Sequence, residues 1–210
     1  EITADGGNVA RIGDAEYATL ADAIAAVQNG DTIELLADVA GDVTITQKKN
    51  VAFTIDGDGH TLAGTMNING TNYAKDEGQA LTIQNLKFIV DDYGIYAYNK
   101  KAKYVRNVTV DGCTFESAVG GETGYGLAVR NIYNFTVKNS SGTGLFDFFY
   151  AAGSVDGLDV ENVTVTDTEN AFFMAYGTKL NFTNVTTSNG DYGISIKNQT
   201  NNGIATITDC

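Results

Sequence analysis

The sequence predicts an all-β fold: a single-stranded parallel β-helix, a solenoid of about six to seven coils of 22–27 residues, with a short N-terminal capping helix. Three observations predict it. A six-residue motif recurs at a nearly constant spacing, each copy alternates apolar and polar residues, and the chain holds 24 glycines and no proline. Such a period is typical of solenoids, and this composition favours strands joined by tight turns over helices.

The repeated motif reads apolar, polar, apolar, polar, and then Asn, Gly or Asp. Copies begin at Leu81, Val108, Phe135, Leu158, Leu180 and Ala205, and an earlier copy begins at Phe53. The fifth positions are residues 85, 112, 139, 162, 184 and 209, so the spacings are 27, 27, 23, 22 and 25 residues. The alternation predicts a half-buried strand. The fifth residue is of a type that tolerates left-handed backbone, which predicts a corner.

A further strand is expected before each following copy. Its alternation predicts an inward file of Ile95, Leu127, Phe148, Phe172 and Ile194. The neighbouring positions are expected to face outward, in three files: Gly94, Gly126, Asp147, Ala171 and Gly193; Tyr96, Ala128, Phe149, Phe173 and Ser195; and Tyr98, Arg130, Ala151, Ala175 and Lys197.

Stacking places equivalent positions of successive coils about 4.8 Å apart. The corner asparagines are therefore expected to hydrogen-bond to one another as a structural ladder, formed by Asn85, Asn139, Asn162 and Asn184. The same stacking puts Cys113 and Cys210 in one inward file, four coils or roughly 19 Å apart. A disulfide needs Cα atoms within about 7 Å, so we expect these two cysteines not to pair.

The first 42 residues differ from the coils, and we expect them to form an N-terminal cap of the same domain, built from a strand, an amphipathic helix and a strand. Thr19 and Asp22 resemble a capping box, and Leu20, Ile24 and Val27 share one helical face. Residues 43–210 are expected to form the coils. No comparable cap precedes Cys210, so we expect a piece of a larger protein or assembly, or end-to-end self-association through that coil.

Net charge and composition limit the classes of partner that the chain is expected to bind. With 26 acidic and 13 basic residues the net charge is -13, so nucleic acid and anionic membranes are not expected to bind. No apolar run is long enough to insert into a bilayer. The acidic balance, few Lys and Arg, and many Thr, Asn and Gly favour an extracellular location for a secreted chain whose signal peptide is not part of this sequence.

The segment YATLADAI from Tyr17, the segment NGDTIELL from Asn29, the segment TIDGDGHTL from Thr54 and the asparagine-cornered coils together resemble a known family. They are similar to the right-handed parallel β-helix domains of the pectin-lyase-like superfamily, especially those of bacterial cell-surface and adhesin-type proteins. The resemblance covers nearly the whole chain. It implies the fold and a bacterial cell-surface setting, but not an activity, because the superfamily includes lyases, hydrolases, adhesins and phage tailspikes.

In polysaccharide-cleaving members of that superfamily, the site lies on the strand that opens each coil. Asp147 is the one carboxylate in the outward files here, whereas glycoside hydrolysis needs two. We therefore assign no catalytic residue. If the chain is an enzyme, Asp147 would act with the loop carboxylates Asp91, Asp92, Glu169 and Asp191. No cofactor or metal is assigned. A Ca²⁺ site at Asp56, Asp58 and Asp111 is the alternative to a plain glycine-rich turn.

The outward aromatic residues suggest binding. Flat rings suit the apolar faces of sugars, and exposed aromatic surface usually meets a partner. The expected ligand-binding residues are Tyr96, Tyr98, Arg130, Phe149, Phe173 and Lys197, unless the loop 116–124 covers them. The first hypothesis is a non-catalytic extracellular adhesin or stalk that binds a glycan or a surface protein. The alternatives are a polysaccharide lyase or glycoside hydrolase and a self-assembling structural subunit.

Overall fold

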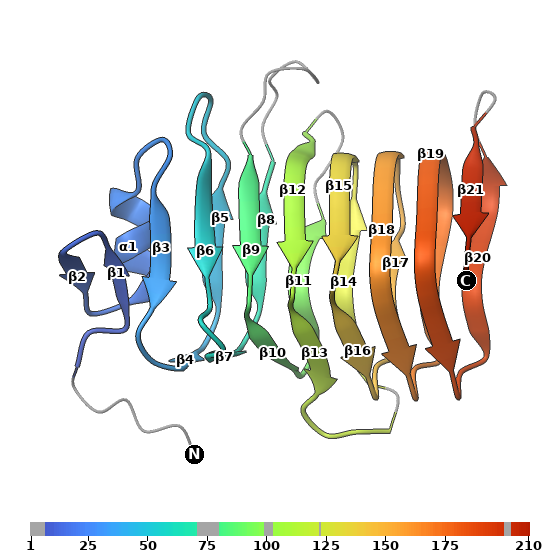
Figure 1. Ribbon diagram of the computed structural model, residues 1–210, viewed down its shortest axis with the longest axis horizontal. Coiled ribbons are helices and arrows are strands. Elements are labelled where there is room, and N and C mark those ends of the chain that lie inside the picture. Colours follow the sequence, from blue (N-terminus) through green and yellow to red (C-terminus); the bar gives the residue numbers. More distant parts are fainter. Residues whose placement is uncertain (1–6, 71–79, 99–102, 122, 200–202) are drawn as a thin grey trace.

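The computed structural model describes residues 7–70, 80–98, 103–121, 123–199 and 203–210. It is a parallel β-solenoid of about seven turns, whose strands lie side by side along one long axis (Figure 1). The all-β prediction is confirmed, with one short helix at the N-terminal end.

The first face of the solenoid carries the repeated motif. Its strands are β3 (Thr32–Leu35), β6 (Phe53–Asp56), β9 (Leu81–Gln84), β12 (Val105–Asp111), β15 (Ile132–Lys138), β18 (Val155–Thr166), β19 (Asn170–Ser188) and β21 (Ala205–Thr208). Each pairs in parallel with the next, and the register joins Leu81, Val108, Phe135, Leu158, Leu180 and Ala205. The alignment of the motif is therefore confirmed.

Two more faces complete each turn. The second consists of β4 (Val39–Ala40), β7 (Thr61–Ala63), β10 (Lys87–Val90), β13 (Thr114–Ser117) and β16 (Ser141–Thr143), and continues in β18 and β19. The third consists of β5 (Val43–Thr46), β8 (Met66–Asn69), β11 (Tyr93–Tyr98), β14 (Tyr125–Arg130), β17 (Asp147–Ala151), the first part of β19 and β20 (Tyr192–Gln199). Inward side chains of the three faces form one continuous core.

The N-terminal end is covered by β1 (Ala10–Ile12), β2 (Ala15–Tyr17) and α1 (Leu20–Ala26). Strand β1 pairs antiparallel with both β2 and β3. The pairing with β3 covers the edge of the first coil that would otherwise be open. The predicted helix start is confirmed, because Thr19 Oγ1 accepts a hydrogen bond from the Asp22 amide at 3.1 Å. Strand β3 already pairs in parallel with β6, so the first coil begins inside the segment expected to be the cap.

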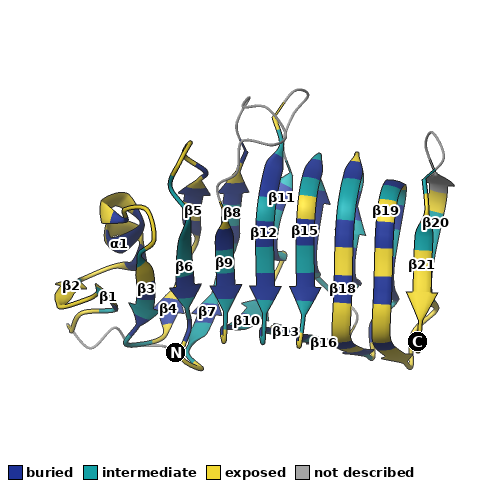
Figure 2. Ribbon diagram, turned by 45° about the horizontal axis from the view of Figure 1, so that its top comes forward, coloured by how far each residue is buried: buried dark blue, intermediate teal, exposed yellow. Residues whose placement is uncertain are grey.

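The last described coil is more open. Strand β21 is largely exposed (Figure 2). Ile207 is 54 % exposed although its register partner Phe182 is fully buried, because within the described residues no further coil lies over it.

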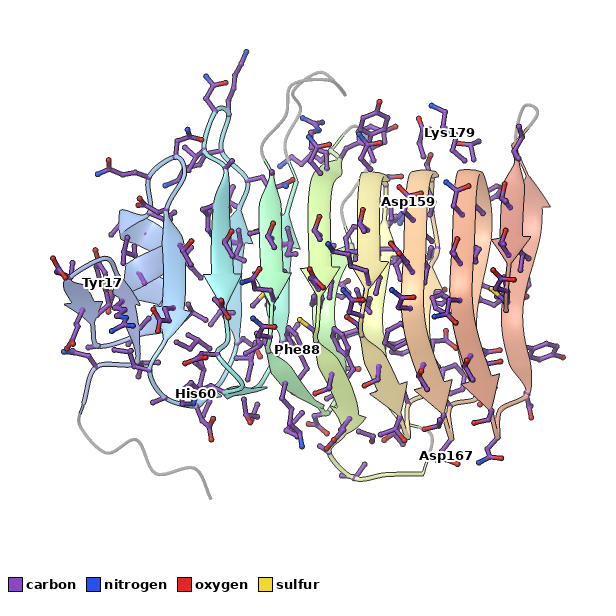
Figure 3. The ribbon with its side chains drawn as sticks, in the orientation of Figure 1. Tyr17, His60, Phe88, Asp159, Asp167 and Lys179 are labelled. Atoms are coloured by element: carbon purple, nitrogen blue, oxygen red, sulfur yellow. The ribbon has the colours of Figure 1, made fainter. Side chains whose placement is uncertain are left out.

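The corners show what the fifth motif residue does. Asn85, Asn139, Asn162 and Asn184 all have φ between 50° and 54°, the left-handed backbone that asparagine tolerates. Asn184 donates to Asn162 Oδ1 at 2.8 Å, and Asn162 donates to Asn139 Oδ1 at 3.2 Å. The expected ladder of four is interrupted, because the fifth position between Asn139 and Asn85 is Gly112, which has no side chain. Asn139 donates instead to Asp111 Oδ1, and Asn85 donates to Asp56 Oδ1. Lys179 and Asp167 have the same backbone at opposite edges of the solenoid (Figure 3).

The prediction for the third face was wrong in one outward file and in one strand. Gly94, Gly126 and Ala171 were expected to face outward and are buried. The register pairs Leu127 with Phe149, not with Phe148, and Phe149 is fully buried rather than outward. At the start of these strands two consecutive residues face inward, as Gly126 and Leu127 do in β14. The extra inward file is filled by Phe148, whose ring lies so close to Gly142 that a Cβ atom there would overlap it. Glycines in that file hid it from the alternation pattern. Ala151 is buried for the same reason: the shift gives it an inward position.

The two cysteines occupy equivalent positions in different coils and make equivalent hydrogen bonds. Cys113 and Cys210 are both free thiols, as expected. Each sulfur donates to the carbonyl two residues before it and to a carbonyl of the preceding coil: Ile83 for Cys113, Phe182 for Cys210. Burial raises the pKa of the Cys113 thiol to about 12, so this residue acts as a buried small side chain.

Candidate ligand-binding site

The candidate site lies on the outer surface of the third face. The register aligns one outward file across β11, β14, β17, β19 and β20, formed by Tyr96, Ala128, Tyr150, Phe173 and Ser195. Tyr150 therefore occupies the place expected for Phe149. Because strand neighbours are about 4.8 Å apart, Tyr96 and Tyr150 originate two strands, or roughly 9.6 Å, from each other, with Ala128 between them.

A pocket of about 370 Å³ opens over Ala128. We call it the tyrosine pocket, and its lining residues are Tyr93, Tyr96, Tyr98, Tyr125, Ala128 and Tyr150. Among the described residues that line the pocket, Ala128 alone has no ring. Ala128 as a whole is only 1 % exposed, because the larger side chains around it cover it. The small side chain at this position leaves the space that forms the pocket.

Five tyrosine rings form a continuous chain of contacts around Ala128. The ring centroids of Tyr98 and Tyr96 are 5.6 Å apart, and those of Tyr96 and Tyr93 are 4.6 Å apart. The chain crosses to the next coil through Tyr93 and Tyr125 at 5.5 Å, and it ends with Tyr125 and Tyr150 at 5.4 Å. These distances lie in the range that aromatic pairs prefer. The five rings make a horseshoe whose free ends are Tyr98 and Tyr150.

Cationic residues lie at the margins of this surface. The Arg130 guanidinium carbon is 5.2 Å from the centroid of the Tyr98 ring, at one free end of the horseshoe. Beyond the other end, Phe173 stacks on Tyr150 with centroids 5.6 Å apart. Lys197 Nζ lies 4.7 Å from the Phe173 centroid. Of the expected binding residues, Tyr96 and Tyr98 line the pocket, whereas Arg130, Phe173 and Lys197 flank it.

Three phenols of the pocket, those of Tyr93, Tyr125 and Tyr150, are held in their neutral form. Burial raises the pKa of Tyr93, Tyr125 and Tyr150. Negative charge adds to the effect, from Asp92 near Tyr93 and from Asp147 near Tyr125. The three hydroxyl groups are therefore hydrogen-bond donors and acceptors at neutral pH, and not bases.

Asp147 is buried beside the pocket rather than outward on the surface as expected. It is 2 % exposed, and its register partners are Tyr125 on one side and Asn170 on the other. The Asn170 amide donates to Asp147 Oδ1 at 2.7 Å. Burial raises the pKa of this carboxyl to about 6; the hydrogen bond from Asn170 opposes the rise and Glu169 adds to it.

The other candidate acids lie in the turns before the third-face strands. Asp91 and Asp92 are exposed, and the Asp92 carbonyl accepts a hydrogen bond from the Tyr125 amide. Asp191 is exposed and Glu169 half-buried, and the Asp191 amide donates to the Glu169 carbonyl at 2.9 Å. None of these four residues lines the tyrosine pocket.

The candidate Ca²⁺ residues already have partners. Asp56 accepts from Gln84, from Asn85 and from the Asp58 amide, and these bonds lower its pKa against the opposing effect of burial. Asp111 accepts from Asn139 and pairs with Lys138 Nζ at 3.1 Å. Across the described ranges, no group of three His, Cys, Asp or Glu residues is placed to hold a metal ion. The amide donors explain this cluster of acids.

Three of the lining tyrosines, Tyr93, Tyr125 and Tyr150, were not among the binding residues predicted from the sequence. A signal for two of them was present, because the dipeptide Tyr-Gly precedes the inward residue in β11, in β14 and again at Tyr192. The loop 116–124 was expected as a possible cover of this face. Its described residues form hydrogen bonds within the loop and to the next coil: Ser117 Oγ and Thr123 Oγ1 are 2.9 Å apart, and the Thr123 amide donates to the Gly144 carbonyl.

Fold and pocket together define a parallel β-solenoid with an aromatic pocket on one face. Comparison with protein-family models, with curated proteins and with solved structures gives no match to this chain. In the part of the chain that the structure describes, no helix is long and apolar enough to span a membrane.

Proposed function

We propose that this protein is a non-catalytic module that binds carbohydrate in the tyrosine pocket. The observation that carries the proposal is the horseshoe of five tyrosine rings around a pocket of about 370 Å³. Ring faces stack on the C–H faces of a sugar, and neutral phenol hydroxyls exchange hydrogen bonds with its hydroxyl groups. A concave site with a few convergent polar groups is the usual form of a small-ligand site.

The arrangement of the acids favours binding over catalysis. Hydrolysis of a glycosidic bond uses two carboxyl groups on either side of that bond. The lining of the tyrosine pocket consists of tyrosines and one alanine, and Asp147 lies buried beside it in a hydrogen bond with Asn170. The raised pKa values of Tyr93, Tyr125 and Tyr150 also disfavour a phenolate base.

The proposal includes an extracellular setting, with the solenoid presenting this face as part of a bacterial cell-surface or adhesin-type protein. The acidic composition and the resemblance of the coils to the pectin-lyase-like superfamily support that setting.

A glycan array tests the proposal with three proteins: the wild type, Tyr150→Ala and Tyr192→Ala. Tyr192 belongs to the same file as Tyr93 and Tyr125, but it is 61 % exposed and lies outside the tyrosine pocket. We expect the wild type and Tyr192→Ala to bind the same glycans and Tyr150→Ala to lose at least about tenfold in affinity, the loss of one stacked, hydrogen-bonded ring. A wild type that binds no glycan, or undiminished binding by correctly folded Tyr150→Ala, contradicts the proposal.

A further inference from the structure

The N-terminal cap treats the faces of the first coil differently. On the first face, β1 pairs antiparallel with β3, so the edge of that sheet is occupied by a strand. The third face begins with β5, whose one strand partner among the described residues is β8. Helix α1, and not a further strand, packs on the other side of β5. The first strand of the third face therefore keeps an edge that the cap does not pair.

This edge of β5 carries main-chain groups without a partner. Val43 and Gln47 donate to main-chain carbonyls on the β8 side. Because successive residues of a strand direct their N–H and C=O groups to opposite sides, those of Thr44 and Thr46 point away from β8. Both threonines are exposed, and no hydrogen bond to their main chain is present in the part of the chain that the structure describes. Such an edge is a template on which another chain can add a strand.

A groove of about 220 Å³ lies between this edge and α1. We call it the cap groove. It is lined by Ile24 and Val27 of α1, by Val51 before β6 and by Phe53 at the start of β6. Val51 and Phe53 are half-buried, so the apolar lining is open to solvent. A cavity of about 150 Å³ holds a benzene ring, and the cap groove therefore has room for one large apolar side chain.

A cation lies at the same groove. Lys48 follows β5, lines the cap groove and is exposed. Within the described ranges it forms no ion pair. In a chain with a net charge of -13, an unpaired lysine beside an apolar groove favours a partner that brings a carboxylate.

The free strand edge, the apolar groove and the lysine together fit one class of occupant. We propose that the cap groove binds an extended peptide segment of a partner protein, which adds a strand to the edge of β5. The peptide main chain pairs with Thr44 and Thr46, one large apolar side chain enters the groove beside Phe53, and a nearby carboxylate meets Lys48. A small apolar acid would leave the two threonines unpaired. The site is separate from the tyrosine pocket and does not depend on carbohydrate binding.

A library of random nonapeptides displayed on phage supplies the probe. The library is selected on the whole wild-type chain, and each enriched peptide is synthesised and titrated by calorimetry. We expect enriched peptides to contain β-branched or aromatic residues, as strands do, and one large apolar residue close to Asp or Glu.

Two leucine variants of α1 localise the bound peptide. Ala25 lines the cap groove and Ala26 does not; both are exposed on the helix, where leucine is well tolerated. Ala25→Leu fills the groove and is expected to lose at least about tenfold in affinity, whereas Ala26→Leu should bind like the wild type. Both variants are checked for native circular dichroism. Ala21→Leu, from the same lining, replaces Ala25→Leu if that variant does not fold.

The charge is tested by Lys48→Gln. We expect this variant to lose about two- to fivefold in affinity for an acidic peptide, the value of one exposed ion pair. The same peptide with its carboxylate replaced by an amide should bind the variant and the wild type equally.

Methylation of single peptide nitrogens separates strand addition from insertion of a side chain alone. In an added strand, alternate residues direct their N–H groups toward β5. We therefore expect methylation at alternate positions to lose at least about tenfold in affinity, and methylation at the positions between them to lose less.

The alternating loss, together with the loss in Ala25→Leu, supports the proposal. Absence of any enriched peptide, undiminished binding by folded Ala25→Leu, or equal effects of methylation at all positions overturns it. Sedimentation of the wild type without peptide tests a second copy as the occupant. A dimer that Ala25→Leu dissociates would assign this edge to self-association and would also overturn the proposal. A protein that binds no arrayed glycan loses the proposed function but not this inference.

Discussion

The asparagine corner and the tyrosine face are both formed by stacked coils. They differ in whether the stacked side chains satisfy one another or leave a space that a ligand can occupy. In the corner file, Asn184 and Asn162 each donate to an asparagine of the coil below, and Asn139 donates to Asp111, so these side chains satisfy one another. In the outward file of the third face, the residue changes at every level, from Tyr96 to Ala128 to Tyr150. A run of hydrogen-bonding side chains closes on itself, whereas a file that alternates large and small residues leaves a cavity that a ligand can fill.

The two regions also differ in backbone. Each ladder asparagine has a positive φ, which most other residues adopt only at a cost in free energy, whereas the tyrosines lie on regular strands. Substitutions in the corner should therefore cost more stability than substitutions on the face, and substitutions on the face should change binding first. Three measurements test this contrast.

The largest loss of stability is expected for Asn162→Ala, in the middle of the ladder. The variant loses two side-chain hydrogen bonds, worth about 1 kcal/mol each, and puts alanine at φ 54°, which costs about 1–2 kcal/mol more. We expect the free energy of unfolding in urea to fall by about 3–4 kcal/mol. Asn162→Gly is the control that relieves the backbone and should recover part of the loss. Equal stability of Asn162→Ala and wild type would show that the ladder is incidental.

The next largest change in stability is expected for Asp147→Asn, which should stabilise the protein by an amount that depends on pH. Asp147 has a pKa raised to about 6 in the folded chain, against 3.8 as the ordinary value. The folded state therefore keeps a proton that the unfolded state releases, and the contribution of Asp147 to stability falls as pH rises from about 4 to about 6. Asp147→Asn stays neutral and keeps the acceptor for Asn170. We expect it to be more stable by about 2–3 kcal/mol at pH 7.5 and equal to wild type near pH 4.

Thermal and urea unfolding of both proteins across pH 3.5–8 measure this difference. A difference that does not change with pH would mean that Asp147 titrates normally and that its burial costs little.

The smallest expected effect is that of Phe173→Ala, beside the pocket. The variant removes the stack with Tyr150 and the contact with Lys197, and we expect a loss of about 1–2 kcal/mol in the free energy of unfolding. Phe173→Leu serves as the control that keeps apolar bulk without a ring and should lose less. A loss as large as that of Asn162→Ala would erase the contrast between the face and the corner.

Much of the fold could be predicted because its signals are local. The motif alternation, the corner residue and the helix start at Thr19 each depend on a few neighbouring residues, and all three are confirmed. The site could be predicted only in part. Tyr96, Tyr98 and Arg130 lie where the alternation put them, but Phe149 was expected outside and is buried. The alternation of apolar and polar residues gave the wrong direction for Phe149 because these strands have a second inward file. Glycines occupy that file in β11 and β14, at Gly94 and Gly126, so no apolar side chain marks it in the sequence.

By itself, the sequence determined the period, the corners and the order of the three strands in each turn, because a repeat with fixed polarity can bury its apolar residues only by stacking. The tertiary structure alone decided which tyrosines meet. Tyr93 and Tyr125 are 32 positions apart in the chain, and their rings touch because the register of β11 and β14 puts them on adjacent strands. That register depends on how Phe148 and the glycines fill the core, a property of packing and not of any single coil.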